Sequence, residues 1–180
     1  RRMPANLGIL LGAFTKNPDS KGRPNYNSAV FLEKGKQAKV FNKHLLPNGD
    51  VFDEARFIEA GTLKNNFLSY KGKTFFITIC EDIWAWPDAT GRSLYKKNPL
   101  LETPKRHVDL VINISASPFY QQKLKQREYM TKKTAQLFKA PVLYANLVGA
   151  QDEVIYDGGS FVVTPSGKVF ARCHQFEEDL

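Results

Sequence analysis

Cysteine and histidine are scarce in this chain, whose 180 residues include two cysteines and three histidines. Cys80 and Cys173 belong to no CxxC pair and to no cluster of cysteine and histidine. A structural zinc site and a disulfide framework are therefore both poor interpretations, and no metal ligand is expected. A reducing compartment suits such a composition, so we predict a cytoplasmic protein.

Long apolar runs are absent too. None approaches the roughly 20 residues that span a bilayer, so no contact with a membrane is expected. Acidic residues are outnumbered, and the net charge is +8. One dense basic stretch is interpreted as the solvated face of a helix; its members are Lys123, Lys125, Arg127, Lys132, Lys133 and Lys139. No nucleic-acid-binding motif accompanies this charge, so nucleic acid is not an expected partner.

What the sequence does contain is apolar runs that alternate with polar segments, at 42% apolar residues overall. Its length fits one domain with a sizeable core. Short apolar runs predict strands at residues 7–14, 28–32, 38–41, 74–79, 108–114, 142–148, 159–163 and 169–172, the first of them as a fully buried strand. A helix is predicted over residues 121–139 and a weak helix or turn over 52–60. This order indicates an α/β protein with a mixed sheet.

Cys80 follows the strongest predicted strand and is itself followed by Glu81 and Asp82. Catalytic groups in α/β sheets often lie beyond the carboxyl ends of the strands. A cysteine is more commonly a small, buried apolar side chain, however. Its position in the sequence alone leaves both interpretations of Cys80 open.

A thiol that attacks an amide needs a base and a donor for the negative oxygen of the tetrahedral intermediate. The three histidines show no neighbouring pattern that is typical of a catalytic triad. A lysine beside a carboxylate is the other arrangement, and Lys43 closes a predicted strand. In a basic protein a lone lysine carries no weight, so Lys43 becomes a candidate only through the pattern around it.

Five blocks in the same order resemble the nitrilase (C–N hydrolase) superfamily, and within it they are most similar to the glutaminase domain of glutamine-dependent NAD synthetases. The blocks are Lys43-x-x-Leu-Pro47 with Val51-Phe-Asp-Glu-x-Arg56, Ile79-Cys-Glu-Asp-Ile-Trp84, Asn113-x-Ser-Ala-Ser-Pro-Phe119, the run Asn146 to Ser160, and Phe176-Glu-Glu-Asp-Leu180. The similarity covers nearly the whole chain from Leu7 onward. A single short motif would be weak support, whereas five in order are specific.

This resemblance implies a four-layer α-β-β-α sandwich and a Glu-Lys-Cys triad that releases ammonia from glutamine through a thioester. Cys80 matches the nucleophile. Lys43 matches the lysine that stabilises the oxyanion together with the backbone N–H of Glu81, and a fixed cation also lowers a thiol pKa. Glu54 resembles an additional glutamate near the triad, although a surface capping or pairing role is an alternative. Ser117 and Lys123 match positions that bind the substrate glutamine.

Two departures accompany the resemblance. The triad glutamate is expected on a segment before residues 7–14, so we interpret residues 1–180 as a partial domain that lacks its N-terminal strand and helix and is inactive alone. Gly49 stands where a tyrosine usually contacts glutamine.

The resemblance also implies a synthetase domain that uses ATP and Mg and is absent from this chain, assembly into a homo-oligomer, and no cofactor in the present segment. Asp157-Gly-Gly-Ser160 matches a glutaminase segment and is weak support for a phosphate loop. Two other interpretations remain: a free-standing amidase of the same superfamily that acts on another small amide, and a non-catalytic fragment.

Overall fold

The computed structural model describes residue 4 and residues 6–49, 51–88 and 90–180. Its strands are β1 (Gly8–Lys16), β2 (Asn25–Glu33), β3 (Lys39–Asn42), β4 (Asn48–Gly49), β5 (Phe52–Asp53), β6 (Phe67–Tyr70), β7 (Lys73–Ile79), β8 (Leu110–Ser115), β9 (Val142–Asn146), β10 (Val148–Gln151), β11 (Val154–Asp157), β12 (Phe161–Val163) and β13 (Val169–Arg172). The helical elements are α1 (Lys123–Phe138) and the 3₁₀ helices η1 (Glu54–Arg56), η2 (Leu63–Asn65), η3 (Cys80–Ile83) and η4 (Pro99–Glu102).

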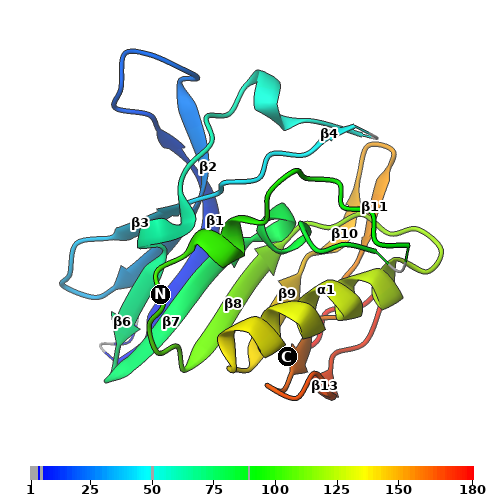
Figure 1. Cartoon of the computed structure of the whole chain (residues 1–180). Coiled ribbons are helices and arrows are strands. Elements are labelled where there is room, and N and C mark those ends of the chain that lie inside the picture. The colour runs from blue at the N-terminus through cyan, green and yellow to red at the C-terminus, as the bar shows by residue number, and fades with distance from the viewer. Residues whose placement is uncertain (1–3, 5, 50, 89) are drawn as a thin grey trace.

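The central element is a six-stranded sheet with the order β13-β12-β9-β8-β7-β6. Strands β7, β8 and β9 run parallel, while β6, β12 and β13 are antiparallel to their neighbours. Helix α1 connects β8 to β9, as a parallel pair requires a crossover connection. The predicted α/β class with a mixed sheet is therefore confirmed (Figure 1).

Both faces of the six-stranded sheet are covered, because successive side chains of a strand point to opposite faces. On one face Phe76 and Val111 are buried with Ala135 of α1. On the other face Ile77 is buried against Phe31 of the sheet β1-β2-β3. This double burial explains why the core strands read as nearly continuous apolar runs.

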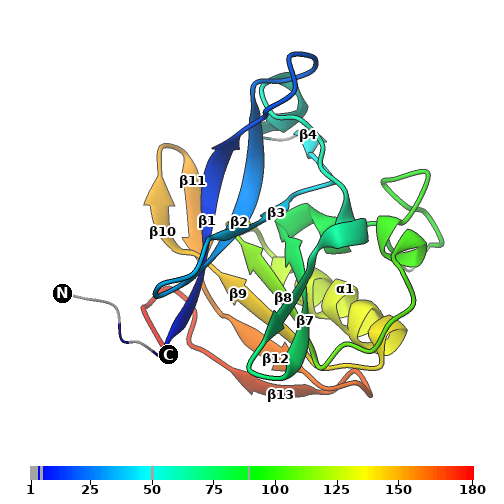
Figure 2. The same ribbon diagram turned by 90° about the vertical axis from the view of Figure 1, so that its left-hand side faces the viewer.

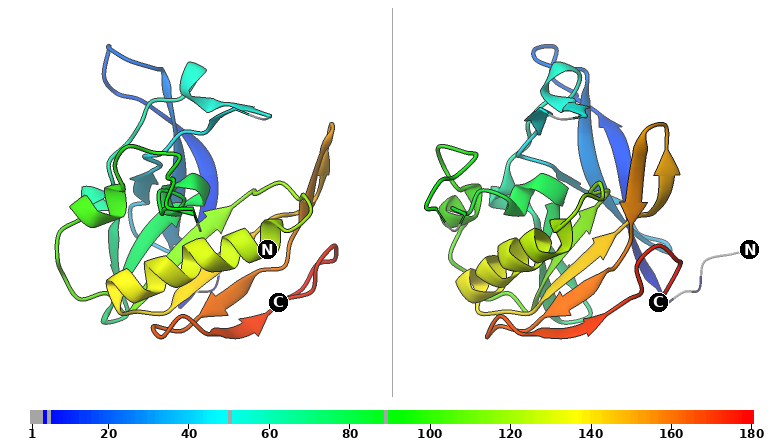
Figure 3. Two further views of the ribbon diagram at one scale, coloured as in Figure 1. Left: turned by 45° about the vertical axis from the view of Figure 1, so that its right-hand side comes forward. Right: turned by 90° about the vertical axis from the view of Figure 1, so that its right-hand side faces the viewer.

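The described residues thus form three layers, in the order helix, sheet and sheet (Figure 2). The expected sandwich has four layers, and these three correspond to the inner two sheets and one helical layer. The hairpin β10–β11, coloured orange, stands out from the body of the molecule (Figure 3).

Of three local expectations, two were wrong and one was right in part. The run at residues 7–14 is not a fully buried strand: Phe14 is 74% exposed, since β1 is an edge strand with one face turned away from the core. Residues 52–60, predicted as a weak helix or turn, contain a two-residue strand and one 3₁₀ turn, so the turn is right and the helix is not. The strand predicted over residues 142–148 ends at Asn146, and the chain then forms the hairpin β10–β11.

Candidate active site

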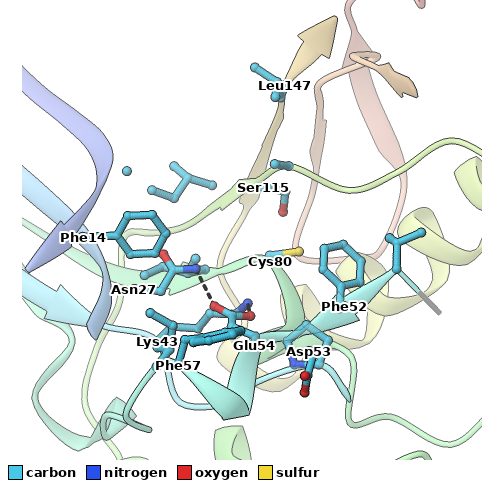
Figure 4. Close-up of a pocket in the computed structure, with 17 residues that line it drawn as sticks. Phe14, Asn27, Lys43, Phe52, Asp53, Glu54, Phe57, Cys80, Ser115 and Leu147 are labelled. Carbon is cyan, nitrogen blue, oxygen red and sulfur yellow. Dashed lines mark hydrogen bonds and ion pairs between the residues drawn. The ribbon is translucent and has the colours of Figure 1, made fainter. Parts of the chain in front are cut away.

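A cavity of about 880 Å³ opens at the carboxyl ends of β7 and β8. Cys80, Lys43 and Glu54 all line it, together with Ser115 (Figure 4). These residues come from separate segments: Lys43 follows β3, Glu54 begins η1, and Cys80 directly follows β7. The position beyond the strand ends is where open α/β sheets place their ligands.

Cys80 is held in a conformation that few side chains adopt. Its φ of 45° lies in the left-handed region, which costs a non-glycine residue on the order of 1 kcal/mol. The turn from β7 into η3 produces this conformation, and the Nδ2 of Asn113 donates to the Cys80 carbonyl over 3.3 Å. Strained residues cluster at functional sites because the surrounding structure must hold them in place.

Opposing influences act on the Cys80 thiol. Burial raises its pKa most strongly, and the nearby carboxylates of Glu81 and Glu54 raise it further. The ammonium of Lys43 and a hydrogen bond from Ser115 lower the pKa. Because burial dominates, the thiol holds its proton at neutral pH more firmly than an exposed cysteine does. The charge of Lys43 is the largest influence that lowers the pKa.

Lys43 is 3% exposed and forms an ion pair with Glu54 Oε2. The other carboxylate oxygen, Oε1, accepts a hydrogen bond from Asn27 Nδ2 over 2.6 Å. Glu54 therefore has a pairing role inside the cavity and not at the surface. The Lys43 ammonium also lines the cavity with Cys80, which suits it to stabilise a second negative atom there.

The backbone of Lys43 is fastened from two sides. Its N–H donates to the carbonyl of Asn27 over 2.9 Å, and its carbonyl accepts from Gly61 N–H over 2.7 Å. A side chain at position 61 would not fit, because an added Cβ would lie 2.4 Å from the Cβ of Asn42. The lysine is thus presented from a rigid segment, although the sequence around it has no regular pattern.

Sequence reasoning did not assign a role to Asp82, which lies within the Ile79–Trp84 block. Its carboxylate is buried, and Oδ1 accepts the backbone N–H groups of His44 and Leu45, each over 2.9 Å. Oδ2 accepts the N–H of Ile79, also over 2.9 Å. Burial raises the pKa of Asp82 to about 6, against the lowering by these hydrogen bonds and by Lys43. The Glu-Asp pair after the cysteine was the signal that could have indicated it.

Glu81 directs its side chain to the loop after η3. Tyr95 Oη donates to Glu81 Oε1 over 2.8 Å, and burial, followed by the charge of Glu81, raises the pKa of Tyr95. The backbone N–H of Glu81 lies in the first turn of η3. N–H groups in a first turn have no partner within their own helix, so this one is suited to an oxyanion.

The two residues predicted to bind glutamine lie apart from the cavity lining. Ser117 is buried, and its hydroxyl accepts a hydrogen bond from Arg127 Nε over 3.2 Å. Lys123 begins α1, and its ammonium lies 4.0 Å from the ring centroid of Trp84 and 4.7 Å from that of Tyr120. The structure brings Ser115 to the cavity in place of Ser117, and the role of both predicted residues stays a prediction.

Arg127 forms the centre of a second buried cluster next to the site. It is paired with Asp157 over 2.7 Å, and both side chains are 0% exposed. Nη2 donates to the carbonyls of Ser117 and Pro118, over 2.7 Å and 3.1 Å. The interpretation of Arg127 as part of a solvated helix face was therefore wrong. The guanidinium holds the loop that follows β8 against α1 and β11.

Gly49 lies in β4 opposite Phe52, which lines the cavity. An added Cβ at Gly49 would meet nothing within 4 Å, but its φ of 137° disfavours a side chain. The aromatic side chain that this strand pair presents to the cavity is therefore Phe52, and position 49 presents none.

The described part of the chain has no group of three or more histidine, cysteine, aspartate or glutamate side chains that could hold a metal ion. It also has no helix that is long and apolar enough to cross a membrane.

The cysteine, lysine and carboxylate thus lie together at the strand ends, and sequence comparison assigns the family of the chain. The carbon-nitrogen hydrolase profile matches residues 2–180, so the chain belongs to the carbon-nitrogen hydrolase family. It is 39% identical over 182 residues to the glutamine-dependent NAD(+) synthetase of Synechocystis sp., covering 99% of this chain and 32% of that protein. The synthetase of Aquifex aeolicus is 36% identical over 155 residues, covering 86% and 25%.

A solved structure agrees with these relatives. The glutamine-dependent NAD+ synthetase of Acinetobacter baumannii superimposes with a TM-score of 0.80 at 32% identity, covering 96% of this chain and 30% of that one. The nitrilase-type fold expected from the sequence is thereby confirmed. The chain spans about a quarter to a third of the length of these relatives.

Proposed function

We propose that this chain is the glutaminase portion of a glutamine-dependent NAD synthetase. The observation that carries the proposal is the joint placement of Cys80, Lys43 and Glu54 around one cavity at the strand ends. The relatives support the choice of glutamine over another small amide, because those compared above are all glutamine-dependent NAD synthetases.

In the proposed reaction the Cys80 sulfur attacks the side-chain carboxamide carbon of glutamine. The carbonyl oxygen becomes an oxyanion, which the Lys43 ammonium and the Glu81 N–H stabilise. The C–N bond then breaks, the nitrogen takes up the proton that the thiol has lost, and ammonia leaves behind a thioester. Water attacks the thioester, and glutamate and the free thiol are released. Glu54 holds the Lys43 ammonium in place throughout through their ion pair.

Ser117 and Lys123 would bind the charged ends of glutamine. Half-buried Lys123 lies at the start of α1, over two aromatic rings, and could reach a carboxylate by releasing one of them. The Ser117 hydroxyl would have to exchange its bond from Arg127 for one from the ligand. Binding of glutamine is thus proposed to need a rearrangement of these two side chains.

The test uses the complete synthetase to which this chain would belong. Cys80→Ala is expected to abolish NAD formation from glutamine, because the thioester cannot form, while NAD formation from added ammonia continues. Cys173→Ala is the matched control and should keep both activities. Retention of glutamine-dependent synthesis in Cys80→Ala would contradict the assignment, and loss of both activities with intact folding would contradict a role confined to supplying ammonia.

For the 180 residues alone we expect little hydrolysis of glutamine. The two carboxylates that act on the thiol are engaged, Glu54 with Lys43 and Asn27, and Glu81 with Tyr95. The absence of a general base typically lowers a rate by about 10²–10⁴-fold. Robust release of ammonia from glutamine by this chain would show that Glu54 or Glu81 serves as the base.

The proposed function includes a synthetase domain that uses ATP and Mg, with no cofactor bound by the present residues. Assembly into a homo-oligomer and a cytoplasmic location stay predictions of the same kind.

A further inference from the structure

Asp82 joins two segments that lie far apart in the sequence. One is the segment after Lys43, which offers the N–H groups of His44 and Leu45, and the other is the end of β7, which offers the N–H of Ile79. Three amide donors therefore converge on one buried carboxylate. Because three donors share one carboxylate, this link is stronger than the single backbone hydrogen bond of an ordinary turn.

The two segments joined in this way carry the two reacting groups. Lys43 directly precedes His44, and Ile79 directly precedes Cys80. We propose that Asp82 is a positioning residue, which sets the distance between the Lys43 ammonium and the Cys80 sulfur by fastening their backbones together. The proposal rests on the proposed function in so far as it takes Cys80 as the nucleophile.

The contacts of Asp82 favour positioning over a direct role. The carboxylate accepts all three bonds from backbone groups and lies outside the residues that line the cavity. Lys43 is the charged side chain that lowers the pKa of Asp82, while the ring of His44 faces away and bonds to the carbonyl of Gly61 over 2.7 Å. The charge of Asp82 also reaches Tyr95, whose pKa it raises in small part after burial and the charges of Glu81 and Cys80.

The first experiment measures alkylation of each thiol by iodoacetamide as a function of pH, with the modified peptides resolved by mass spectrometry. Asp82→Asn places an NH₂ group where a carboxylate oxygen accepts a backbone N–H, which breaks the link on one side. We expect the rate at Cys80 near neutral pH to fall about tenfold, because the thiol pKa rises when Lys43 is no longer held close. The rate at Cys173 should not change.

The matched control is Asp88→Asn. Asp88 also accepts two backbone N–H groups, from Thr90 over 2.8 Å and Arg92 over 3.0 Å, but it is exposed. This variant should leave the pH profile of Cys80 as in the wild type. A wild-type profile in a folded Asp82→Asn variant would overturn the proposal.

A second measurement applies if Asp82→Asn does not fold. In the wild type the amide protons of His44, Leu45 and Ile79 are expected to shift together in an NMR titration, with one inflection near pH 6, since the pKa of Asp82 is raised to about 6. Independent inflections for the two segments would refute a shared acceptor. Both readouts are independent of glutamine hydrolysis, so failure of the proposed function and failure of this proposal are distinguishable.

Discussion

Two buried ion pairs lie near the ends of the parallel strands, and they are built from the same kinds of charge. Lys43 pairs with Glu54 at the wall of the cavity, and Arg127 pairs with Asp157 in a cluster where both side chains are 0% exposed. The guanidinium uses Nε, Nη1 and Nη2 on protein acceptors. The ammonium has three donors, and Glu54 is its hydrogen-bond partner among the described residues.

The two cations differ in how many of their hydrogen-bond donors are already bonded to protein acceptors, and this difference indicates different roles. A planar guanidinium with every edge bonded fixes a loop and has nothing to offer a substrate. A compact ammonium with one partner, beside a cavity and a thiol, can still stabilise a new negative charge. Loss of the Arg127 pair is therefore expected to change stability, and loss of the Lys43 pair to change reactivity.

The largest effect is predicted for Asp157→Asn. The change leaves the Arg127 guanidinium buried without its counter-ion, and such a loss costs about 3–5 kcal/mol. Urea unfolding measures the free energy of unfolding. Glu128→Gln is the control, because Glu128 pairs with Arg172 on the more exposed side of α1 and should contribute about 0–1 kcal/mol. Equal losses in the two variants would contradict the structural role of the Arg127 pair.

A smaller and different effect is predicted for Lys43→Met. The Cys80 thiol loses the cation that lowers its pKa, so alkylation near neutral pH should slow by about tenfold or more. The free energy of unfolding should fall less than in Asp157→Asn, because Glu54 keeps its bond to Asn27 and faces the cavity.

Lys36→Met serves as the control for charge, since Lys36 forms an exposed pair with Glu33. Lys36→Met should change neither the alkylation rate of Cys80 nor the free energy of unfolding. Lys43→Met could instead lose as much stability as Asp157→Asn and leave the alkylation rate of Cys80 unchanged. That result would contradict the assignment of reactivity to the Lys43 pair.

The smallest effect concerns pH and a third buried acid. Asp82 is held by amide donors, and its pKa is raised from 3.8 to about 6 because burial outweighs them. The folded state therefore binds a proton more tightly than the unfolded state. The stability that Asp82 contributes is complete below about pH 4 and is lost as the pH rises through about 6.

Asp82→Asn removes this titration. The free energy of unfolding should therefore depend less on pH between pH 4 and 6 than in the wild type. Urea midpoints across this range measure it, with Asp88→Asn as the control. An identical slope in wild type and Asp82→Asn would show that the carboxyl does not titrate there.

Much of the fold was predictable because burial on both faces leaves a direct trace in the sequence. The core strands β7 and β8 and the helix α1 appear as apolar runs and a segment of helix formers of nearly the right length. Residues 52–60 were not predictable in this way. Glu54 of this segment pairs with Lys43 of an earlier segment, and no periodicity encodes such a contact.

The sequence by itself determined the family and made Cys80 and Lys43 the candidate site residues, because the order of blocks around them is specific. Only the tertiary structure decided which charges line the cavity and which are buried in an ion pair away from it. Arg127 and Lys123 stand four residues apart in one basic stretch, yet one is fully buried in an ion pair and the other lies over aromatic rings. The physical reason is that the effect of a charge depends on its partners and on its distance from water, and long-range folding sets both.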